Sequence, residues 1–229
     1  MFRAVCFDCD STLSAVEGID LLAQRAGVRA AIAPLTRAAM DGTLRLEEVY
    51  RRRLELIRPD RAAVDWLAEQ YRTGCVAGAR EVIAKLGREG RAVHIVSGGV
   101  WQAVAAFAGS LDVPPERVHA VRLEFDAAGG YAGYEASSPL AGSGGKAAVC
   151  GRIARDAGRT VLVGDGVTDL EAAAAGVPVI GFGGVARREA VIKGAAVYID
   201  APSLHPVLDA IHTLERSATE GGFAPCGRD

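Results

Sequence analysis

The chain has 229 residues, of which 50% are hydrophobic and 24% charged, and its formal net charge is −2. This near-neutral balance argues against partners that require a basic surface, so we expect no nucleic acid and no membrane as partners. The five cysteines, an odd number, and the four histidines, which lack an H-x-x-x-H spacing, argue against a disulfide framework and a histidine metal site.

The first predicted element is a buried strand at residues 3–7. Its apolar stretch is too short for a signal peptide or a membrane span, so we expect a cytoplasmic protein. Similar apolar runs predict three more buried parallel strands, at 92–96, 160–163 and 177–180. Pro178 lies inside the last run and favours an edge position for that strand, because proline cannot donate a hydrogen bond to a neighbour.

Helical patterns separate these strands and supply the crossovers that a parallel sheet requires, for example at 79–86 and 146–157. Residues 17–71 break this alternation, because they show helical periodicity and no credible strand. Within them, the apolar residues of 46–57 fall on one stripe, as in an amphipathic helix. We therefore expect an α/β fold: a Rossmann-like parallel sheet with helices on both faces and a helical domain inserted after the first strand.

The remaining segments complete the expected domain organisation. At 121–135, two short extended pieces flank a turn-rich Asp-Ala-Ala-Gly-Gly spacer, which predicts a β-hairpin. The last dozen residues contain Gly-Gly and Pro without periodicity, a pattern typical of a flexible tail. The expected division is an α/β core at 1–13 and 75–216, a helical insert at 14–74 and a tail at 217–229.

Two carboxylates stand where the chain leaves the first predicted strand. Asp8 and Asp10 are two residues apart and share a face if the strand continues. A partly buried carboxylate pair is destabilising unless a cation neutralises it, and a hard, oxygen-preferring ion such as Mg²⁺ is the natural partner. The alternative is a capping aspartate followed by a turn, and Asp-x-Asp alone does not separate the two readings.

A second acidic cluster, Gly-Asp-Gly-Val-Thr-Asp at 164–169, follows the third predicted strand. Because functional groups of open α/β sheets gather beyond the carboxyl ends of the strands, both acidic clusters could face one crevice. The glycines would let the backbone approach a ligand closely. Thr168 and Asp169 could instead cap the following helix, an alternative that leaves Asp165 unexplained.

The second predicted strand ends in Ser97-Gly98-Gly99, which offers a hydroxyl and small backbone positions suited to phosphate oxygens, or a simple tight turn. Lys146, in Gly-Ser-Gly-Gly-Lys, is a candidate cation for the same anion, or a solvated lysine that opens a helix. The segment fails as a Walker A loop, because Leu140 and Ala147 stand where the first glycine and the metal-binding hydroxyl belong.

Taken in order, Asp-x-Asp-Ser-Thr, Ser-Gly-Gly, Gly-Lys and Gly-Asp-Gly-x-x-Asp resemble the motifs of the haloacid-dehalogenase-like phosphohydrolases. More narrowly, the chain resembles the phosphoserine phosphatases of that superfamily over 4–214. The stretches that carry this likeness are Asp-Ser-Thr-Leu-Ser-Ala-Val-Glu-Gly-Ile-Asp at 10–20, Ser-Gly-Gly-Lys at 143–146 and Ile-Gly-Phe-Gly-Gly at 180–184. The resemblance implies an Mg²⁺-dependent phosphatase that releases serine and phosphate from free phosphoserine, the last step of serine biosynthesis.

The resemblance implies a role for each matching acidic residue. Asp8 would be the nucleophile that forms an acyl phosphate, and also a ligand of Mg²⁺. Asp10 would be the general acid and then the general base, with its backbone carbonyl on the metal. Asp165 would be the remaining direct metal ligand, and Asp169 would hold a metal-bound water from the second shell.

The resemblance also implies which groups bind the substrate's phosphate. The Ser97 hydroxyl, the Gly98 amide and the Lys146 ammonium would bind the phosphoryl oxygens, and Lys146 would stabilise charge during catalysis. Thr168 would contact the substrate, although many relatives carry Asn at this position.

The helical insert corresponds, by this resemblance, to a cap over the crevice. Glu17 would meet the substrate ammonium and Arg53 its α-carboxylate, which matches the charges of a zwitterionic amino acid. Residues 51–53 are all arginine, however, and such a run ordinarily forms a solvated helix face. Three positions depart from common relatives without removing a catalytic group: Cys9, Leu46 and Val100.

Two other functions stay open from the sequence. One is a phosphatase or phosphotransferase of the same superfamily that acts on another small phosphomonoester. The other is a non-catalytic phospho-ligand binder or a phospho-accepting signalling domain. Asp10 argues against the latter, because a positioned acid–base should hasten the hydrolysis of an acyl phosphate. The resemblance is compatible with a homodimer.

Overall fold

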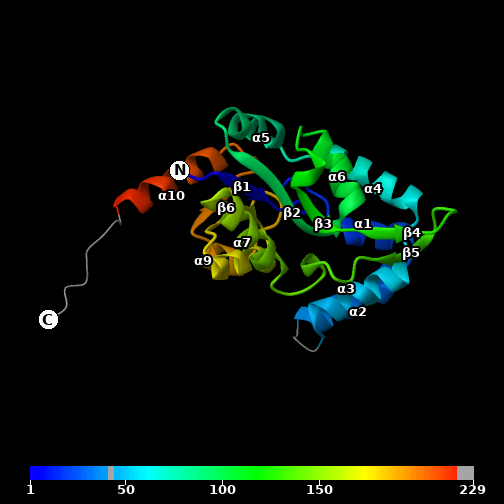
Figure 1. The fold of residues 1–229 in the computed structure, drawn as a ribbon. Helices are drawn as coiled ribbons and strands as arrows, with labels where there is room; N and C mark the ends of the chain where they lie inside the picture. Colours follow the sequence, from blue (N-terminus) through cyan, green and yellow to red (C-terminus); the bar gives the residue numbers. More distant parts are fainter. Residues whose placement is uncertain (41–43, 221–229) are drawn as a thin grey trace.

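The computed structural model of the protein describes residues 1–40 and 44–220. Its strands are β1 (Ala4–Phe7), β2 (Ala92–Val100), β3 (Val118–Val121), β4 (Leu123–Phe125), β5 (Tyr131–Tyr134), β6 (Thr160–Gly164), β7 (Val179–Phe182) and β8 (Val197–Ile199). Six of them form one parallel sheet in the order β3-β2-β1-β6-β7-β8, while β4 and β5 form a separate antiparallel hairpin (Figure 1). The predicted α/β class, the four predicted strands and the hairpin are confirmed.

The helices are α1 (Gly18–Arg25), α2 (Arg29–Met40), α3 (Leu46–Ile57), α4 (Arg61–Thr73), α5 (Ala79–Arg88), α6 (Trp101–Gly109), α7 (Gly145–Ala157), α8 (Val167–Leu170), α9 (Glu189–Gly194) and α10 (Val207–Glu220). The amphipathic helix predicted at 46–57 is α3, with the same bounds. The helices predicted at 79–86 and 146–157 correspond to α5 and α7, and each connects two parallel strands of the sheet.

The central strand β1 is buried on both faces, which explains its uninterrupted apolar sequence. Alternate side chains of a strand point to opposite faces, and here Val5 and Phe7 join a core cluster with residues of α5, α6 and α10. Ala4 and Cys6 join the second cluster, which contains residues of α7. Helices therefore cover both faces of the sheet, as the sequence predicts.

Helices α1 to α4 lie between β1 and β2 in the chain, where the sequence predicts a helical insert. The β4–β5 hairpin packs beside them, although it lies much later in the sequence (Figure 1). The Arg58 guanidinium donates to the Tyr131 carbonyl at 3.2 Å, and the Arg61 guanidinium stacks over the Phe125 ring at 4.8 Å from its centroid. The hairpin thus forms part of the structure around the insert.

Three details of the C-terminal half differ from the sequence expectations. Strand β7 begins after Pro178 and lies between β6 and β8, so the predicted edge position is wrong. The Pro178 carbonyl still accepts a hydrogen bond from the Leu162 amide at 3.0 Å. Helix α10 reaches Glu220, so residues 217–220 of the expected tail are helical, and 221–229 lie outside the described residues. In the described ranges, no helix is long and apolar enough to cross a bilayer.

Candidate active site

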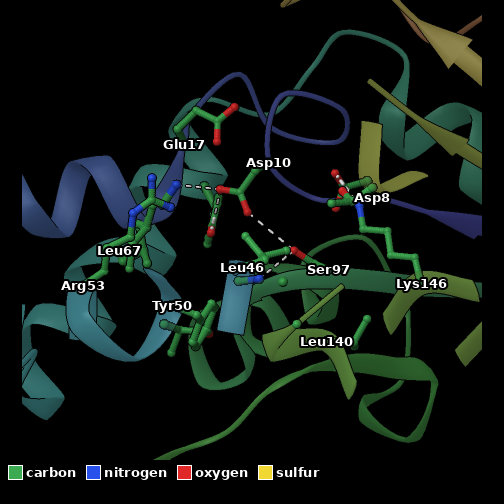
Figure 2. A pocket seen from close by; sticks show the side chains of 18 of the residues that line it. Asp8, Asp10, Glu17, Leu46, Tyr50, Arg53, Leu67, Ser97, Leu140 and Lys146 are labelled. Carbon is green, nitrogen blue, oxygen red and sulfur yellow. Dashed lines mark hydrogen bonds and ion pairs between the residues drawn. The ribbon is translucent and has the colours of Figure 1, made fainter. Parts of the chain in front are cut away.

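The candidate residues come together because β1, β2 and β6 are adjacent parallel strands. Phe7 lies beside Ile95 of β2 and Val163 of β6, so the carboxyl ends of these strands share one edge of the sheet. Asp8 follows β1 and Asp165 follows β6, whereas Ser97 lies within the last part of β2. At this edge, a pocket of about 250 Å³ opens between the strand ends and the helices of the insert (Figure 2). The predicted residues that line it are Asp8, Asp10, Glu17, Arg53, Ser97, Gly98, Lys146 and Thr168.

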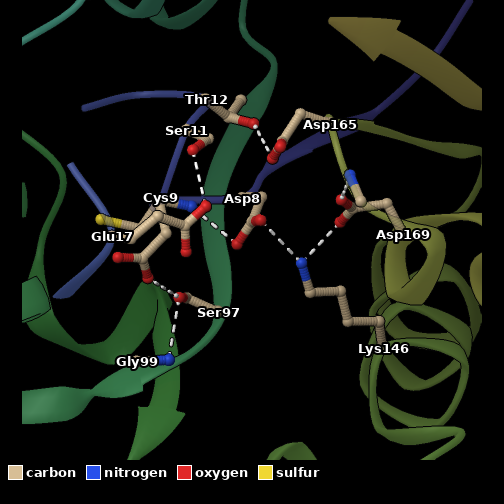
Figure 3. Close-up of polar contacts among 12 residues, drawn as sticks. Asp8, Cys9, Ser11, Thr12, Glu17, Ser97, Gly99, Lys146, Asp165 and Asp169 are labelled. Carbon is tan, nitrogen blue, oxygen red and sulfur yellow. Dashed lines mark hydrogen bonds and ion pairs between the residues drawn. The ribbon is translucent and has the colours of Figure 1, made fainter. Parts of the chain in front are cut away.

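Lys146, at the start of α7, is the central cation of the site. Its ammonium lies 2.9 Å from Asp8 Oδ2 and 2.6 Å from Asp169 Oδ1 (Figure 3). Burial by itself lowers the pKa of this lysine, but the Asp169 and Asp8 carboxylates outweigh it and raise the pKa above its usual value. Lys146 is only 6% exposed, so it is not the solvated surface lysine that its position in the sequence also allowed.

Asp169 makes two contacts, and one of them is the helix cap that the sequence allowed. Its Oδ1 binds Lys146, while its Oδ2 accepts a hydrogen bond from the Gly166 amide at 2.8 Å, which caps α8. Position 164 must be glycine for this packing, because a Cβ there would lie 2.2 Å from the Asp169 carboxyl carbon. Burial raises the pKa of Asp169 to about 6, and the Lys146 charge opposes this shift.

Asp165 is buried and bonded from two sides. The Thr12 hydroxyl donates to its Oδ1 at 3.2 Å, and the Arg188 guanidinium forms an ion pair with its Oδ2 (Figure 3 shows the first of these). The same guanidinium lies 3.3 Å from Glu17 Oε1, so it links the core to the insert. Sequence reasoning missed Arg188, because nothing in its local pattern separates it from its neighbour Arg187.

Asp8, Asp165 and Asp169 form a cluster in which one carboxylate oxygen from each residue lies within 4.8 Å of the other two. All three are buried, and Lys146 and Arg188 together neutralise only part of their charge. Carboxylate oxygens are hard donors, and a concentrated, buried negative charge favours a hard divalent cation. These residues therefore fit a divalent metal site.

The Asp10 side chain points away from this cluster, toward the insert. Its Oδ1 accepts hydrogen bonds from the Gly18 amide at 2.5 Å and the Tyr71 hydroxyl at 3.0 Å, while the Ser97 hydroxyl lies 3.4 Å from Oδ2 (Figure 2 labels Asp10 and Ser97). Burial raises the pKa of Asp10 to about 7, and the negative charges of Asp8 and Glu17 add to the shift. Asp10 can therefore gain and lose a proton near neutral pH.

Ser97 and the two glycines after it form a small polar surface between Asp10 and Lys146. Ser97 is 1% exposed, and its hydroxyl accepts a hydrogen bond from the Gly99 amide at 3.0 Å. Position 99 has little space for a side chain, because a Cβ there would lie 3.1 Å from Asp10 Oδ2. A buried hydroxyl beside backbone amides and an ammonium is suited to bind the oxygens of an anion.

The insert supplies a charged pair and an apolar wall. Glu17 accepts a hydrogen bond from the Ser11 hydroxyl at 2.7 Å and stays partly exposed at the pocket. Arg53 is partly buried and lines the pocket, and burial lowers its pKa against the opposing charges of Asp20 and Glu17. The apolar lining consists of Ile19, Leu46, Leu67, Val100 and Leu140.

The run of three arginines on α3 divides between two environments. Arg51 and Arg52 are 45% and 46% exposed, and both form ion pairs with Glu48 on the outer side of the helix. Arg53 instead lies at the pocket. The solvated-face reading of the run therefore holds for Arg51 and Arg52 alone. The polar side chains of the pocket that sequence reasoning did not single out are Tyr50, Tyr71 and Glu171.

Comparison with known proteins agrees with this geometry. Residues 5–174 match the family model of the haloacid dehalogenase-like hydrolases. The chain is 39% identical to the phosphoserine phosphatase of Rattus norvegicus over 198 residues, which are 86% of this chain and 88% of that protein. It is 38% identical to the phosphoserine phosphatase of Homo sapiens over the same shares of the two chains.

Solved structures show the same relationship. A substrate-bound phosphoserine phosphatase complex is 27% identical with a TM-score of 0.77, over 92% of this chain and 98% of that chain. A phospho-aspartyl intermediate analogue of phosphoserine phosphatase is 28% identical with a TM-score of 0.76, over 91% and 98%. The chain belongs to the haloacid dehalogenase-like hydrolase family, and within it the chain groups with the phosphoserine phosphatases.

Proposed function

We propose that the protein hydrolyses free phosphoserine to serine and phosphate, with Asp8 as the nucleophile and Mg²⁺ as the cofactor. The observation that carries the proposal is the position of Asp8 in one pocket with a buried lysine, a protonatable carboxyl group and a pair of opposite charges on the insert. Relatives at 39% identity that span most of the chain carry the name of this activity.

The acidic cluster indicates where a metal ion would be held. Asp8 and Asp165 would bind Mg²⁺ through their carboxylates, Asp10 would bind it through its backbone carbonyl, and Asp169 would hold a water of its coordination shell. Bound Mg²⁺ would neutralise negative charge on the phosphoryl group and on Asp8. Oxygen-only donors favour Mg²⁺ over softer metals, which is the physical basis for this choice.

In the first half-reaction, an Asp8 carboxylate oxygen attacks phosphorus as the bond from phosphorus to the serine oxygen breaks. Asp10 transfers its proton to that oxygen, so serine leaves as the alcohol and Asp8 carries an acyl phosphate. A protonated Asp10 near neutral pH suits this step, because an alkoxide is a poor leaving group. Lys146, Ser97 and the Gly98 amide bind the phosphoryl oxygens.

In the second half-reaction, Asp10 accepts a proton from water while the water oxygen attacks phosphorus. The bond between phosphorus and the Asp8 oxygen breaks, which restores the carboxylate and releases phosphate. Asp10 ends protonated and ready for the next turnover. A single carboxyl group can serve both steps because its pKa lies near the working pH.

The insert supports the choice of phosphoserine among phosphomonoesters. Glu17 would bind the substrate ammonium, and the planar Arg53 guanidinium would bind its α-carboxylate. Partial burial of Arg53 strengthens such an ion pair relative to one at an exposed arginine. Thr168 lines the pocket and would contact the bound substrate. Cytoplasmic location and a homodimer stay predictions from the sequence.

The test is a kcat/KM panel with Mg²⁺ that compares phosphoserine, phosphothreonine and other small phosphomonoesters. We expect phosphoserine to have the highest value, and Asp8→Asn to abolish turnover of every substrate. Locating a beryllium fluoride adduct on Asp8 would test the nucleophile directly. Preference for another ester, or transfer of phosphate to an added alcohol in place of water, would replace the proposed substrate or reaction. Near-normal turnover by Asp8→Asn would eliminate the proposed nucleophile.

A further inference from the structure

Tyr71 is a fully buried phenol whose hydroxyl reaches the proposed acid–base residue. It lies near the end of α4, in the insert, and its hydroxyl donates to Asp10 Oδ1 at 3.0 Å across 61 positions in sequence. Its exposure is 0%, yet it lines the same pocket as Asp8 and Asp10. A buried tyrosine hydroxyl ordinarily requires a partner, and here that partner is a carboxyl group that the proposed mechanism protonates and deprotonates.

The phenol is held in place from several sides. Its ring stacks on Phe107 of the core helix α6, with centroids 5.8 Å apart. Its hydroxyl lies so close to Gly18 that a Cβ at that position would be 2.2 Å from the oxygen. The Tyr71 carbonyl accepts a hydrogen bond from the Ser14 hydroxyl at 3.0 Å, at the point where the chain enters the insert. The hydroxyl therefore has a fixed position relative to Asp10.

The two oxygens of the Asp10 carboxyl group have different surroundings. Oδ1 receives two donors, the Gly18 amide at 2.5 Å and the Tyr71 hydroxyl at 3.0 Å. Among the described residues, Oδ2 has only the distant Ser97 hydroxyl at 3.4 Å, on the side of the core strands (Figure 2). Two donors on Oδ1 leave no favourable site for a further proton there, so the proton of a neutral carboxyl group is directed to Oδ2.

We propose that Tyr71 is a positioning residue that, together with the Gly18 amide, holds Asp10 so that its transferable proton lies on Oδ2. The proposal rests on the proposed function, because it concerns the transfer of that proton to the leaving oxygen of an alkyl phosphate. As the bond between phosphorus and the ester oxygen breaks, the proton moves from Oδ2 to that oxygen. The resulting Asp10 carboxylate keeps both hydrogen bonds at Oδ1.

The test uses the leaving-group dependence of Tyr71→Phe, which removes the hydroxyl and keeps the ring that stacks on Phe107. We expect kcat/KM for phosphoserine to fall about tenfold, the usual effect of a hydrogen bond to an ionisable group. For p-nitrophenyl phosphate, kcat/KM should change by less than about twofold, because a nitrophenolate leaves without protonation. The ratio kcat/KM covers only the steps up to loss of the leaving group, so hydrolysis of the acyl phosphate does not obscure the comparison.

The matched control is Tyr198→Phe, which removes a buried phenol oxygen from β8, away from the pocket. Both kcat/KM values should match those of the wild type. Equal losses on the two substrates in Tyr71→Phe would mean that Tyr71 supports the fold of the pocket and not the proton donor, and an unchanged phosphoserine value would also overturn the inference. A wild-type enzyme that cleaves the aryl ester but no alkyl phosphate would overturn the proposed function and this inference together.

Discussion

The core half and the insert half of the site differ in how far their charged side chains are buried and paired. On the core side, Asp8, Asp165, Asp169 and Lys146 are at most 7% exposed, and each has an oppositely charged partner. On the insert side, the Glu17 side chain is 45% exposed and much of the surrounding wall is apolar. Buried, paired charges give fixed electrostatics that every phosphate ester would meet, whereas the more exposed, largely apolar insert half can select among esters.

Removing the Lys146 ammonium should impair catalysis for all substrates. Lys146→Met leaves Asp8 and Asp169 buried without their shared partner. We expect kcat/KM to fall by about 10³-fold for every phosphomonoester, and the free energy of unfolding to fall by about 3–5 kcal/mol. Steady-state kinetics and urea unfolding measure the two effects.

Lys85→Met is the control for this change, because the Lys85 side chain on α5 is 50% exposed and lies outside the pocket. It should change the free energy of unfolding, and the transition-state free energy obtained from kcat/KM, by no more than about 0.5 kcal/mol each. If Lys146→Met impaired the hydrolysis of phosphoserine but not of aryl phosphates, the core half would not act on all phosphate esters alike, and the proposed difference between the two halves would be wrong.

Changing the insert half should separate substrates from one another. Glu17→Gln removes the charge that would meet an ammonium and keeps an oxygen for the Ser11 hydroxyl. We expect the transition-state free energy for phosphoserine, obtained from kcat/KM, to rise by about 1.5–3 kcal/mol, the range for a lost charged hydrogen bond. For an aryl phosphate without an ammonium, the rise should be much smaller. Glu55→Gln, on the exposed side of α3, is the matched control. Equal losses on both substrates would argue against ammonium recognition by Glu17.

Asp10 lies between the two halves, and its ionisation should affect stability in metal-free protein. Its folded-state pKa is raised to about 7 by burial and by the charges of Asp8 and Glu17, so the native state binds this proton more tightly than the unfolded chain does. Protonation of Asp10 therefore contributes to the free energy of unfolding. This contribution is complete below the pKa that Asp10 has in the unfolded chain, and it is lost as pH rises through about 7.

Asp10→Asn removes this dependence and keeps an acceptor for Gly18 and Tyr71. In EDTA, we expect the free energy of unfolding of the variant, relative to that of the wild type, to rise by on the order of 1–3 kcal/mol as the pH increases from about 4 to about 8. Urea unfolding across this range measures the difference. A difference between the two proteins that stays constant with pH would show that Asp10 does not titrate in this window.

Local sequence patterns were sufficient for most of the core half. Short continuous apolar runs predicted β1, β2, β6 and β7, and Asp8 and Asp165 follow two of these strands directly. Strands β3 and β8 were missed, because His119 interrupts the apolar run of β3 and β8 has only three residues, so neither offers a continuous apolar run of four. The edge position inferred from Pro178 was wrong because the strand starts one residue after it.

The sequence by itself determined which side chains stand at the ends of neighbouring strands, because strand period and chain order are local properties. Only the tertiary structure decided that Arg188 reaches both Asp165 and Glu17, and that Tyr71 reaches Asp10. These contacts depend on how α4 packs against α6 and on how the loop before α9 folds back over the site. Such packing joins residues far apart in sequence, and no local periodicity records it.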